Sequence, residues 1–452
     1  MPVPDPSPAM TQPISLPLLG TTDATRSVAW RQGRAVGAGE FLAHVDQVAR
    51  QLPLARHVIN LCEDRYAFLV AFCAALTRGQ TNLLPPSRAP QAVADILAAH
   101  PEGYTLSEQP LPKVPPGHVY LPALRDADTP SAAMPMIATN HVAAIGYTSG
   151  STGRPQASIK TWGSYAASTA GNLAMYRRHL DEPFHVLATV PPQHMYGMEM
   201  SVLLPLFGNI GVHAGRPLLP ADVARALDEL PAPRVLVTTP VHLRALVASG
   251  QAMPPLAAMV SATAPMPRDL ACAAEAHFDA PLLEVFGSTE TCVFASRRSA
   301  REDAWTTYPG VTLHPQPDGT RIEAPQLAEP ATLADIVELT DTGFRLVGRN
   351  SDLLDMAGKR ASLADLNQRL LAIDGIEDGV IFQLDDADTL GVRRLAALVV
   401  APTLDEVDIL ATLRRAIDPV FLPRPLRKVE HLPRNATGKL PRAALLGLLA
   451  HD

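Results

Sequence analysis

The chain has 452 residues, of which 47% are apolar and 18% charged, and its formal net charge at pH 7 is −7. This composition excludes an intrinsically disordered chain, and the length favours two or three domains over a single core. The acidic balance gives no global reason to expect nucleic acid as a partner. The longest apolar stretch, residues 66–76, is too short to cross a bilayer, which predicts no membrane insertion.

The ends of the chain and its cysteines bear on the compartment. The Pro-rich N-terminus lacks the basic and apolar regions of a signal peptide. Four cysteines are scattered singly in apolar surroundings without metal-ligand spacing, namely Cys62, Cys73, Cys272 and Cys292. Such cysteines are typical of reduced core residues, so we expect a cytoplasmic protein.

Short β-rich runs alternate with amphipathic segments of helix length from about residue 57 onward. This alternation predicts an α/β fold built from layers of parallel sheet and helices. The first part contains predicted strands at 57–62, 81–84 and 142–147 and predicted helices at 64–78, 90–100 and 162–180. Residues 101–135 are rich in proline and are predicted to be a surface excursion.

The same alternation continues through the middle of the chain. The predicted strands are 185–190, 234–239, 259–262 and 282–286, and the predicted helices are 220–230, 240–249 and 267–278. Several strands end in loops that carry hydroxyls, histidine or acids. Because ligands of open parallel sheets bind at the carboxyl ends of the strands, these loops are expected to converge on one cleft.

The character of the chain changes after about residue 305, where Pro- and Thr-rich strand-like segments begin. A polar break at residues 348–352 predicts a domain boundary. We therefore expect a large N-terminal domain, 1–349, and a small mobile α+β domain, 350–452. The small domain contains predicted helices at 363–372 and 404–417 and predicted strands at 379–383 and 395–400.

An unusual loop follows the apolar run at 142–147. It consists of Thr148, Ser149, Gly150, Ser151, Thr152 and Gly153, and helix-like sequence resumes after Lys160. Glycines let the backbone turn and approach a ligand closely, and the hydroxyls and amides can donate to phosphate oxygens. Taken alone, the loop is either a phosphate-binding loop or an ordinary Ser/Gly connector.

The loop is not the common nucleotide-binding loop, because no Gly-Lys-Ser/Thr follows the glycines. It resembles the Thr-Ser-Gly-Ser/Thr-Thr-Gly loop of the adenylate-forming enzymes, which include acyl-CoA synthetases, peptide-synthetase adenylation domains and luciferases. Four further matches follow in the order of that family: Pro-Pro-Gln-His-Met-Tyr-Gly at 191–197, Val-Phe-Gly-Ser-Thr-Glu at 285–290, Gly-Arg with a later Asp and Gly at 348–358, and Pro-Arg-Asn-Ala-Thr-Gly-Lys at 433–439.

The resemblance implies a reaction and its cofactors. Such enzymes activate a carboxylate by attack on the α-phosphate of ATP, release pyrophosphate and then transfer the acyl group from AMP to a thiol. Charge spreads over phosphoryl oxygens during the first step, so donors, cations and Mg²⁺ are required. ATP and Mg²⁺ are therefore the expected cofactors, and the expected activity is that of an acid–thiol ligase.

The resemblance also assigns roles to residues. The implied catalytic residues are Lys439, His194, Glu290 and Thr289, with Glu290 as the Mg²⁺ ligand. The implied ATP-binding residues are Thr148–Gly153 of the loop (148–153), Lys160, Thr263, Ala264, Phe286, Gly287, Ser288, Asp335 and Arg349. The implied acid-binding residues are His194, Tyr196, Gly197, Met198, Ser261, Ala262 and Gly287. Lys439, a flexible cation on a mobile domain with its hinge at Ser351 or Asp352, is expected to reach both carboxylate and α-phosphate.

The sequence departs from the family pattern in three places. Gln156 stands where the family usually has a lysine, and Lys160 is a candidate replacement. Thr263 and Ala264 stand where glycines are usual. The small domain keeps Gly358 of its motif but lacks the Pro-x-Glu that follows, which weakens the expectation about the thioester-forming conformation.

Residues 193–198 bear on the acid. They carry no acidic side chain for the ammonium of an amino acid, and Met195, Tyr196 and Met198 suit a small planar acid. The compact chain resembles the ligases of aryl-polyene and xanthomonadin pigment biosynthesis, which load hydroxybenzoate-type acids onto an acyl carrier protein. An acyl-CoA synthetase for an aryl or fatty acid and a non-catalytic adenylate-binding regulator are alternatives, and a kinase is a distant third.

A run of cations near the C-terminus bears on the acceptor. It comprises Arg424, Arg427, Lys428, Arg434, Lys439 and Arg442, against a single acid, Glu430. Such a patch can attract the acidic helix of an acyl carrier protein or the phosphates of coenzyme A. A merely solvated face is the alternative interpretation.

Overall fold

The computed structural model describes residues 14–124, 133–149, 155–317, 319–349, 353–356, 359–387, 393–435 and 438–450. The chain forms two compact units. The first unit comprises Met1–Glu302, Thr307–Val311 and Ala324–Glu329, and the second comprises Asp303–Thr306, Thr312–Glu323 and Pro330–Asp452. This division does not fall at residue 349, and the expected domains 1–349 and 350–452 stay a prediction.

The first unit contains a six-stranded sheet with the strand order β10-β9-β5-β4-β6-β7. Strands β4, β5, β6, β7 and β9 pair in parallel, whereas β10 pairs antiparallel with β9. The strands are β4 His57–Asn60, β5 Thr81–Leu84, β6 Gly103–Ser107, β7 Val119–Tyr120, β9 Val142–Ser149 and β10 Pro155–Thr161.

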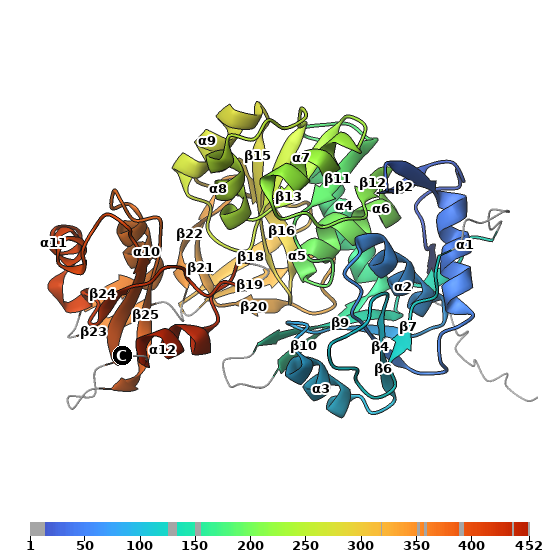
Figure 1. Ribbon diagram of the computed structural model, residues 1–452, viewed down its shortest axis with the longest axis horizontal. Coiled ribbons are helices and arrows are strands. Elements are labelled where there is room, and N and C mark those ends of the chain that lie inside the picture. Colours follow the sequence, from blue (N-terminus) through green and yellow to red (C-terminus); the bar gives the residue numbers. More distant parts are fainter. Residues whose placement is uncertain are drawn as a thin grey trace, which may run out of the picture. The chain divides into compact units, whose positions relative to one another are not determined.

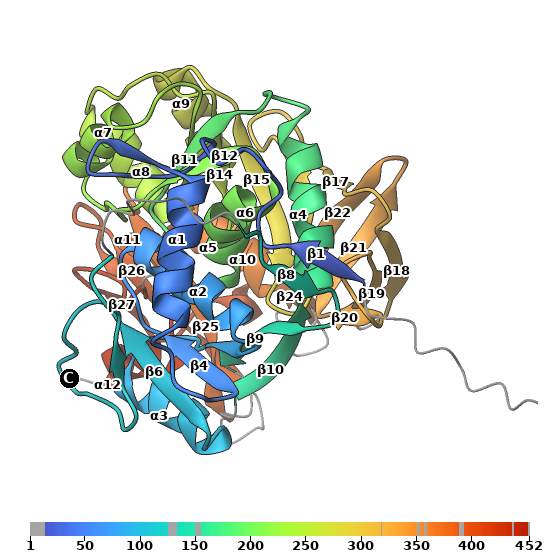
Figure 2. The ribbon, with the colours of Figure 1, turned by 90° about the vertical axis from the view of Figure 1, so that its right-hand side faces the viewer.

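Alternate side chains of this sheet enter two different cores. Val58 packs into the core that contains helix α2 (Arg65–Thr77), and the next residue, Ile59, packs against α3 (Pro90–Ala99). Successive side chains of a strand point to opposite faces, so α2 and α3 cover opposite faces of the sheet (Figure 1). Helix α1 (Ala38–Ala49) packs beside α2 (Figure 2), and β1 (Ser15–Pro17) pairs with β8 (Met136–Ala138).

A second sheet of the first unit has the strand order β16-β15-β14-β13-β11-β12-β2-β3. The strands from β15 to β2 are parallel, whereas β16 pairs antiparallel with β15 and β3 pairs antiparallel with β2. Their bounds are β2 Ser27–Arg31, β3 Arg34–Gly37, β11 Phe184–Ala188, β12 Ile210–His213, β13 Arg234–Thr238, β14 Ala258–Ser261, β15 Leu282–Ser288 and β16 Cys292–Arg297.

Helices cover both faces of this second sheet. Three of them, α7 (Pro220–Asp228), α8 (Pro240–Ser249) and α9 (Arg268–Phe278), share one core with the strands (Figure 1). The other face packs against α4 Trp162–Tyr176, α5 Met195–Met198, the π-helix η1 Glu199–Leu203 and α6 Leu204–Phe207. The runs of Val, Leu and Ile in these strands reflect burial on both faces.

The second unit consists of small sheets, three α-helices and a short 3₁₀-helix in its described residues. One sheet consists of strands β18 Thr312–Gln316, β19 Gly319–Glu323 and β20 Ala331–Leu333. In a second group, β22 (Gly343–Arg349) pairs with β21 (Asp335–Thr340) and with Trp305 and Thr306 of β17 (Trp305–Thr307). A hairpin of β23 Leu353–Met356 and β24 Lys359–Ser362 precedes a third sheet of β25 Asp378–Ala387, β26 Arg393–Val400 and β27 Leu426–Lys428.

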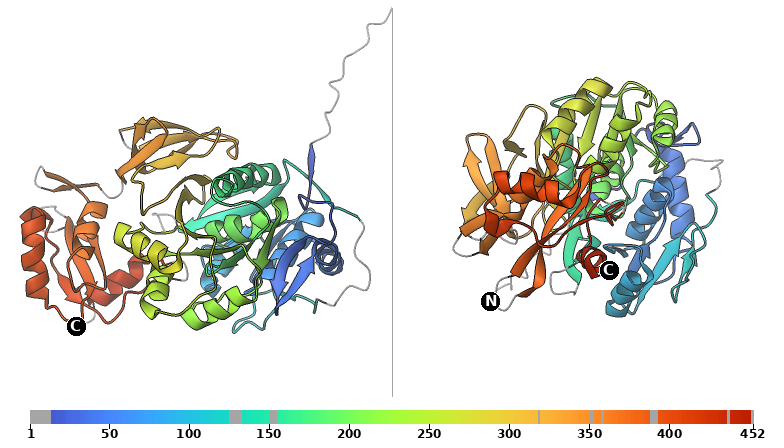
Figure 3. Two further views of the ribbon diagram at one scale, coloured as in Figure 1. Left: turned by 90° about the horizontal axis from the view of Figure 1, so that it is seen from above. Right: turned by 60° about the vertical axis from the view of Figure 1, so that its left-hand side comes forward.

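The third sheet is sandwiched between helices. Leu395 and Ala397 of β26 pack with α10 (Leu363–Leu371) and α11 (Glu406–Ala416), whereas Ala396 and Leu398 pack with Leu445 of α12 (Arg442–Ala450). The short 3₁₀-helix η3 (Pro419–Phe421) closes the first of these cores. Figure 3 shows these helices, in orange and red, flanking the small sheet.

The predicted elements are confirmed with boundary shifts of a few residues, and the α/β class with parallel layers is confirmed. Two expectations are wrong. Residues 155–161 form strand β10 rather than loop, and the Pro-rich stretch 101–135 contains strands β6 and β7. Both errors involve strands with mixed polar and apolar side chains, whose formation depends on pairing with a distant neighbour.

Two further expectations concern cysteines and membranes. Cys62, Cys73 and Cys292 are buried, but Cys272 is exposed, so its assignment to the core is wrong. Cys272 belongs to α9, whose core-facing residues are Ala271, Ala274 and Phe278. Among the described residues, no helix combines the length and the apolar content needed to span a membrane.

Candidate active site

A tight turn joins β15 to β16 and carries the predicted metal ligand, Glu290. The Ser288 N–H donates to Thr291 Oγ1 at 3.0 Å, and the Thr291 N–H donates back to Ser288 Oγ at 3.3 Å. Cys292 completes the turn with φ of +58°, a left-handed conformation that is uncommon outside glycine. These contacts fix the backbone from Ser288 to Cys292, here called the Glu290 turn, and leave Thr289 and Glu290 half-buried.

The hairpin of β9 and β10 packs one face against the Glu290 turn. Ser158 lies opposite Gly146 in the antiparallel register, so their side-chain positions share this face. A Cβ on Gly146 would lie 2.8 Å from Thr289 Cγ2 and 3.3 Å from Met195 Cε. Glycine at 146 therefore allows the hairpin, the Glu290 turn and helix α5 to meet.

Hydrogen bonds join this hairpin face to the turn. Ser158 Oγ donates to the Thr289 carbonyl oxygen at 3.3 Å, and Lys160 Nζ donates to the Glu290 carbonyl oxygen at 2.6 Å. Thr148 Oγ1 donates to Glu290 Oε1 at 3.4 Å. The structure thus brings together Thr148, Lys160, Thr289 and Glu290, which the sequence analysis had assigned to ATP and Mg²⁺.

The atoms gathered at this point suit Mg²⁺. Mg²⁺ prefers oxygen ligands and is commonly held by one or two carboxylates together with substrate phosphates. Glu290 supplies one carboxylate, beside the hydroxyls of Thr148 and Thr289. No group of three His, Cys, Asp or Glu residues is placed to hold a metal in the described ranges.

A buried carboxylate, Glu199, lies behind the Glu290 turn. It accepts the Val293 N–H with both oxygens, at 3.0 and 3.1 Å, and it also accepts from Ser168 Oγ and from Asn172 Nδ2 at 3.3 Å. Burial raises the pKa of Glu199, although these hydrogen bonds and the charge of Lys160 oppose the shift. The sequence does not single out Glu199 as a site residue; its only mark there is that it is a single acid inside the apolar run 195–206.

The predicted acid-binding segment begins at the half-buried His194, the N-cap residue of α5. Tyr196 is buried, and its hydroxyl lies within hydrogen-bond distance of the carbonyl oxygens of Thr238 at 3.0 Å and Val260 at 2.9 Å. A Cβ on Gly197 would lie 2.0 Å from the Pro191 carbonyl oxygen, so only glycine permits this contact. Met198 is fully buried.

The carboxyl ends of two parallel strands, β11 and β13, are joined close to this segment. The buried Arg65 donates through Nη2 to the carbonyl oxygens of Ala188 at 2.9 Å and Val190 at 2.7 Å, and burial lowers its pKa to about 9. Between those two carbonyls, Thr189 Oγ1 is hydrogen-bonded to His242 Nδ1 at 2.9 Å and to Thr238 Oγ1 at 3.0 Å. Arg65 and His242 received no role from the sequence, and both hold the strand end that leads into residues 191–197.

Two segments carry the remaining predicted residues of the first unit. Phe286 of β15 packs edge-on against Phe294, with ring centroids 5.4 Å apart, and Gly287 pairs with Val293 in the register of β15 and β16. Ser261 ends β14 and is buried, and its Oγ has no hydrogen-bond partner among the described residues. Ala262, Thr263 and Ala264 follow, and Thr263 has φ of +81°, where glycine is favoured.

The second unit carries Lys439, Asp335 and Arg349. Lys439 is exposed in a loop whose backbone is fixed by Asn435: its N–H donates to Asn435 Oδ1 at 2.9 Å, and its carbonyl accepts the Asn435 N–H at 2.8 Å. Arg434 strengthens the loop by pairing with Asp378 and donating to the Gly438 carbonyl at 2.8 Å. Asp335 begins β21 directly opposite Arg349, the last residue of β22.

One predicted residue of the first unit remains. Ser149 is the last residue of strand β9.

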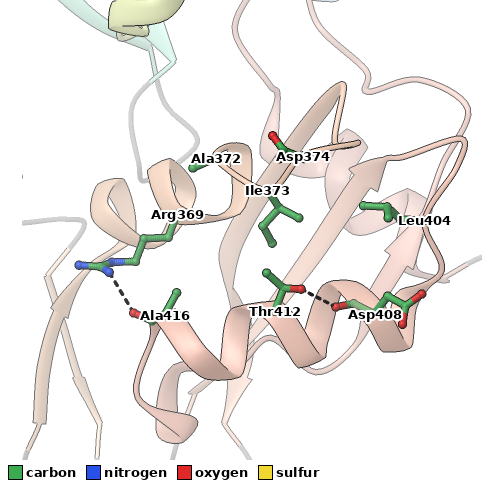
Figure 4. A pocket seen from close by; sticks show the side chains of 8 residues that line it. All are labelled: Arg369, Ala372, Ile373, Asp374, Leu404, Asp408, Thr412 and Ala416. Carbon is green, nitrogen blue, oxygen red and sulfur yellow. Dashed lines mark hydrogen bonds between the residues drawn. The ribbon is translucent and has the colours of Figure 1, made fainter.

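Several predicted positions fall outside the described residues, namely Gly150, Ser151, Thr152, Gly153, Ser351, Asp352 and Gly358. A surface depression does lie within the second unit, between α10 and α11 (Figure 4). Its lining includes Arg369, Asp408 and Thr412, with Arg369 Nη1 donating to the Ala416 carbonyl at 2.9 Å. No predicted site residue lines it, so we place the site by the residue contacts above.

Known proteins resemble this chain in sequence and in fold. Residues 21–323 match the AMP-binding enzyme family. A 4-coumarate–CoA ligase of Rhodobacter capsulatus is 30% identical over 302 residues, which cover 66% of this chain and 74% of the relative. A 2-succinylbenzoate–CoA ligase of Bacillus licheniformis is 24% identical over 431 residues, which cover 85% and 88%.

The fold has counterparts among solved structures. The o-succinylbenzoate coenzyme A synthetase of Bacillus subtilis, in complex with ATP and magnesium ion, superposes with a TM-score of 0.80 at 16% identity, covering 95% of this chain and 99% of that one. The MatB protein of Rhodopseudomonas palustris, with bound ATP, gives a TM-score of 0.77 at 18% identity over 94% and 96% of the two chains. The chain belongs to the AMP-binding enzyme family and is an adenylate-forming acid–thiol ligase that uses ATP and Mg²⁺.

Proposed function

We propose that the enzyme adenylates a small aromatic acid of the hydroxybenzoate type, releases pyrophosphate and transfers the acyl group to the phosphopantetheine thiol of an acyl carrier protein. The observation that supports the choice of substrate is that the carboxylate of Glu199 is already fully hydrogen-bonded. Glu199 adjoins the apolar segment 195–198, but its side chain is buried and accepts hydrogen bonds from Val293, Ser168 and Asn172. An amino acid would need a free carboxylate for its ammonium, because burying an unpaired charge is costly.

The relatives support an aromatic acid. The ligases of R. capsulatus and B. licheniformis are named for 4-coumarate and 2-succinylbenzoate, both aromatic carboxylates. Met195, Tyr196 and Met198 of this chain are buried, flat or polarizable apolar side chains, of the kind that packs well against an aromatic ring. In this proposal His194, Tyr196, Gly197 and Met198 border the acid together with Ser261, Ala262 and Gly287.

The roles proposed for the other residues follow from charge. Loop 148–153 donates to the phosphates, and Glu290 holds Mg²⁺ beside Thr148 and Thr289. When bound, Mg²⁺ neutralises charge on the phosphoryl oxygens. Lys439, carried by the proposed mobile domain 350–452, stabilises the negative charge that develops between carboxylate and α-phosphate.

Further residues are proposed to hold the nucleoside of ATP. Phe286 borders the adenine, with Ser288, Thr263 and Ala264 near it. Asp335 and Arg349 are proposed to hold the ribose. The paired positions of Asp335 and Arg349 on β21 and β22 support a shared ligand.

Pyrophosphate exchange tests the acid. The protein is given ATP, Mg²⁺ and a panel of benzoates, cinnamates, fatty acids and amino acids, and exchange of labelled pyrophosphate into ATP is measured. We expect the strongest exchange with hydroxybenzoates. Exchange confined to fatty acids or amino acids contradicts the proposed substrate. If none of the acids supports exchange, the non-catalytic adenylate-binding regulator is favoured. If the product is ADP instead of AMP, the protein transfers a phosphoryl group as a kinase does.

The acceptor is tested separately, because coenzyme A and a carrier protein present the same phosphopantetheine thiol. The CoA ligase relatives support coenzyme A, whereas the basic run around Arg424 and Arg427 supports an acidic carrier. With the preferred acid, we expect faster acyl transfer to a holo-carrier protein than to coenzyme A at equal thiol concentration. Transfer to coenzyme A alone contradicts the carrier.

A further inference from the structure

We propose that Lys160 and Glu199 form a buried, oppositely charged clamp that positions the Glu290 turn for Mg²⁺, with Lys160 acting through the backbone rather than by contact with phosphate. The inference rests on the proposed role of Glu290 as the Mg²⁺ ligand. It replaces the expectation that Lys160 substitutes for the family lysine at position 156.

The first observation is the contact of Lys160. The residue is only 2% exposed, and its Nζ donates to the Glu290 carbonyl oxygen at 2.6 Å. Ser158, two residues earlier on the same face of β10, donates to the preceding carbonyl, that of Thr289. Two successive carbonyls of the turn are therefore held from one strand.

The second observation is the distance between positions 156 and 160. Both belong to β10, where four residues span about 13 Å. Gln156 lies opposite Thr148, next to the predicted phosphate loop, whereas Lys160 lies opposite Ala144 at the far end of the hairpin. A lysine side chain extends about 6 Å, so Nζ of Lys160 does not reach the place of a lysine at 156 while it binds the turn.

The third observation is the matching contact of Glu199. Its carboxylate accepts the Val293 N–H, one residue beyond Cys292, where the Glu290 turn ends. Lys160 thus holds the turn at Glu290 through a carbonyl, and Glu199 holds its far side through an amide. Glu199 is the first residue of the π-helix η1, a rare local geometry that is frequent at functional sites.

Charge explains why both members are present. A buried cation or anion needs a compensating charge, and the charge of Lys160 acts on the buried Glu199 carboxylate. The opposite charges of Lys160 and Glu199 therefore balance each other inside the protein.

The test measures metal binding directly. Mn²⁺ replaces Mg²⁺, a non-hydrolysable ATP analogue is present, and free Mn²⁺ is counted by electron paramagnetic resonance for the full-length protein. We expect Lys160→Met and Glu199→Gln each to weaken Mn²⁺ binding by about 10- to 100-fold, the effect typical of losing a group that orients a metal ligand. Lys160→Arg, which keeps charge and donors, should recover most of the affinity.

Binding of the analogue without metal separates a turn-holding lysine from a phosphate-binding one. In the presence of a chelator, Lys160→Met should bind the analogue as tightly as the parent protein, because the clamp acts only on the metal ligand. Weaker metal-free binding with unchanged Mn²⁺ affinity overturns the proposal. Adding Gln156→Lys to Lys160→Met should not restore Mn²⁺ binding, and restoration would show that Lys160 serves the phosphates.

Two controls complete the design. Lys113→Met removes an exposed lysine that belongs to no predicted site, and it should leave Mn²⁺ binding unchanged. The double variant Lys160→Met with Glu199→Gln keeps the charges balanced, so it should fold even where a single variant does not, and it should still bind Mn²⁺ weakly. If Glu290→Gln leaves Mn²⁺ binding intact, Glu290 is not the metal ligand and the proposed site is wrong. If Glu290→Gln weakens Mn²⁺ binding but the Lys160 and Glu199 variants do not, only the proposed clamp is wrong.

Discussion

Lys439 combines a fixed backbone with an exposed side chain. Hydrogen bonds from Asn435 and the ion pair between Arg434 and Asp378 hold its loop, so the backbone that carries the ammonium group is fixed. This arrangement suits a cation that acts on charge developing in another molecule.

The first prediction concerns this lysine. Lys439→Ala should slow pyrophosphate exchange by about 100- to 1,000-fold, the range found for loss of one group that stabilises transition-state charge. The melting temperature should not change, because the side chain is exposed. Lys428→Ala, on another exposed lysine of the second unit, is the control, and near-normal exchange in Lys439→Ala would rule out the catalytic role.

Thr263 is strained, because its φ of +81° lies in a region that side chains with a branched Cβ avoid. The second prediction is that Thr263→Gly raises the free energy of unfolding by about 1 kcal/mol through release of this strain. Urea unfolding measures it. Ala262→Gly, beside it and without a positive φ, should instead lower stability, and a loss in Thr263→Gly as well would show that side-chain contacts of Thr263 outweigh its strain.

At the scale of elements, a histidine pair links strand β4 and the end of helix α3 to strand β9. His57 of β4 and His100 at the end of α3 have ring centroids 4.5 Å apart, and His100 Nε2 is hydrogen-bonded to the Tyr147 hydroxyl at 2.5 Å. Tyr147 precedes Thr148 on β9. The state of this pair therefore bears on the strand that leads into the loop.

The third prediction is a pH dependence of stability. Burial lowers the pKa of His57 and His100 below 6.5, so the unfolded chain binds protons more readily than the folded one. Their contribution to stability is complete above pH 6.5 and is lost as the pH falls through that value towards the folded pKa. Urea unfolding at about pH 7.5 and about pH 5.5 should show the loss.

Substitution identifies the source of this pH dependence. The double variant His57→Gln with His100→Gln should reduce the loss of stability between the two pH values, whereas His277→Gln, at an exposed histidine of α9, should not. Part of the loss should remain, because burial also lowers the pKa of His118, His179, His185 and His242. A parent-like profile in the double variant would assign the dependence to other groups.

At the scale of the whole molecule, a basic cluster stands out against a net charge of −7. Arg424 is exposed and Arg427 half-exposed, and Arg427 belongs to the short strand β27. Arg424 and Arg427 are therefore the cluster members that we choose for tests of partner binding.

The fourth prediction follows from that choice. Reversing both charges, Arg424→Glu with Arg427→Glu, should raise the KM for an acidic carrier protein and make it less sensitive to salt. Pyrophosphate exchange should be unaffected, since it does not involve the carrier. Reversal of Arg414 and Arg415 on α11 is the matched control, and an unchanged KM for the carrier would show that the cluster is only a solvated face.

The sequence by itself determined the α/β class, most helices and strands, and the identity of Glu290, Thr148 and Lys439 as candidate site residues. Each depends on information held locally, because buried parallel strands are continuous apolar runs and the motifs are short. Strand β10 was not predicted from the sequence, because its mixed polar and apolar segment forms a strand only by pairing with β9.

Only the tertiary structure decided what Lys160 and Glu199 do. Lys160 binds a carbonyl oxygen 130 residues away, and Glu199 accepts an amide 94 residues away. Every residue has a carbonyl and almost every residue an amide, so such partners leave no mark in the sequence. The backbone groups that bind these two charged side chains are therefore known only from the tertiary structure, as is the position of Glu290 beside them.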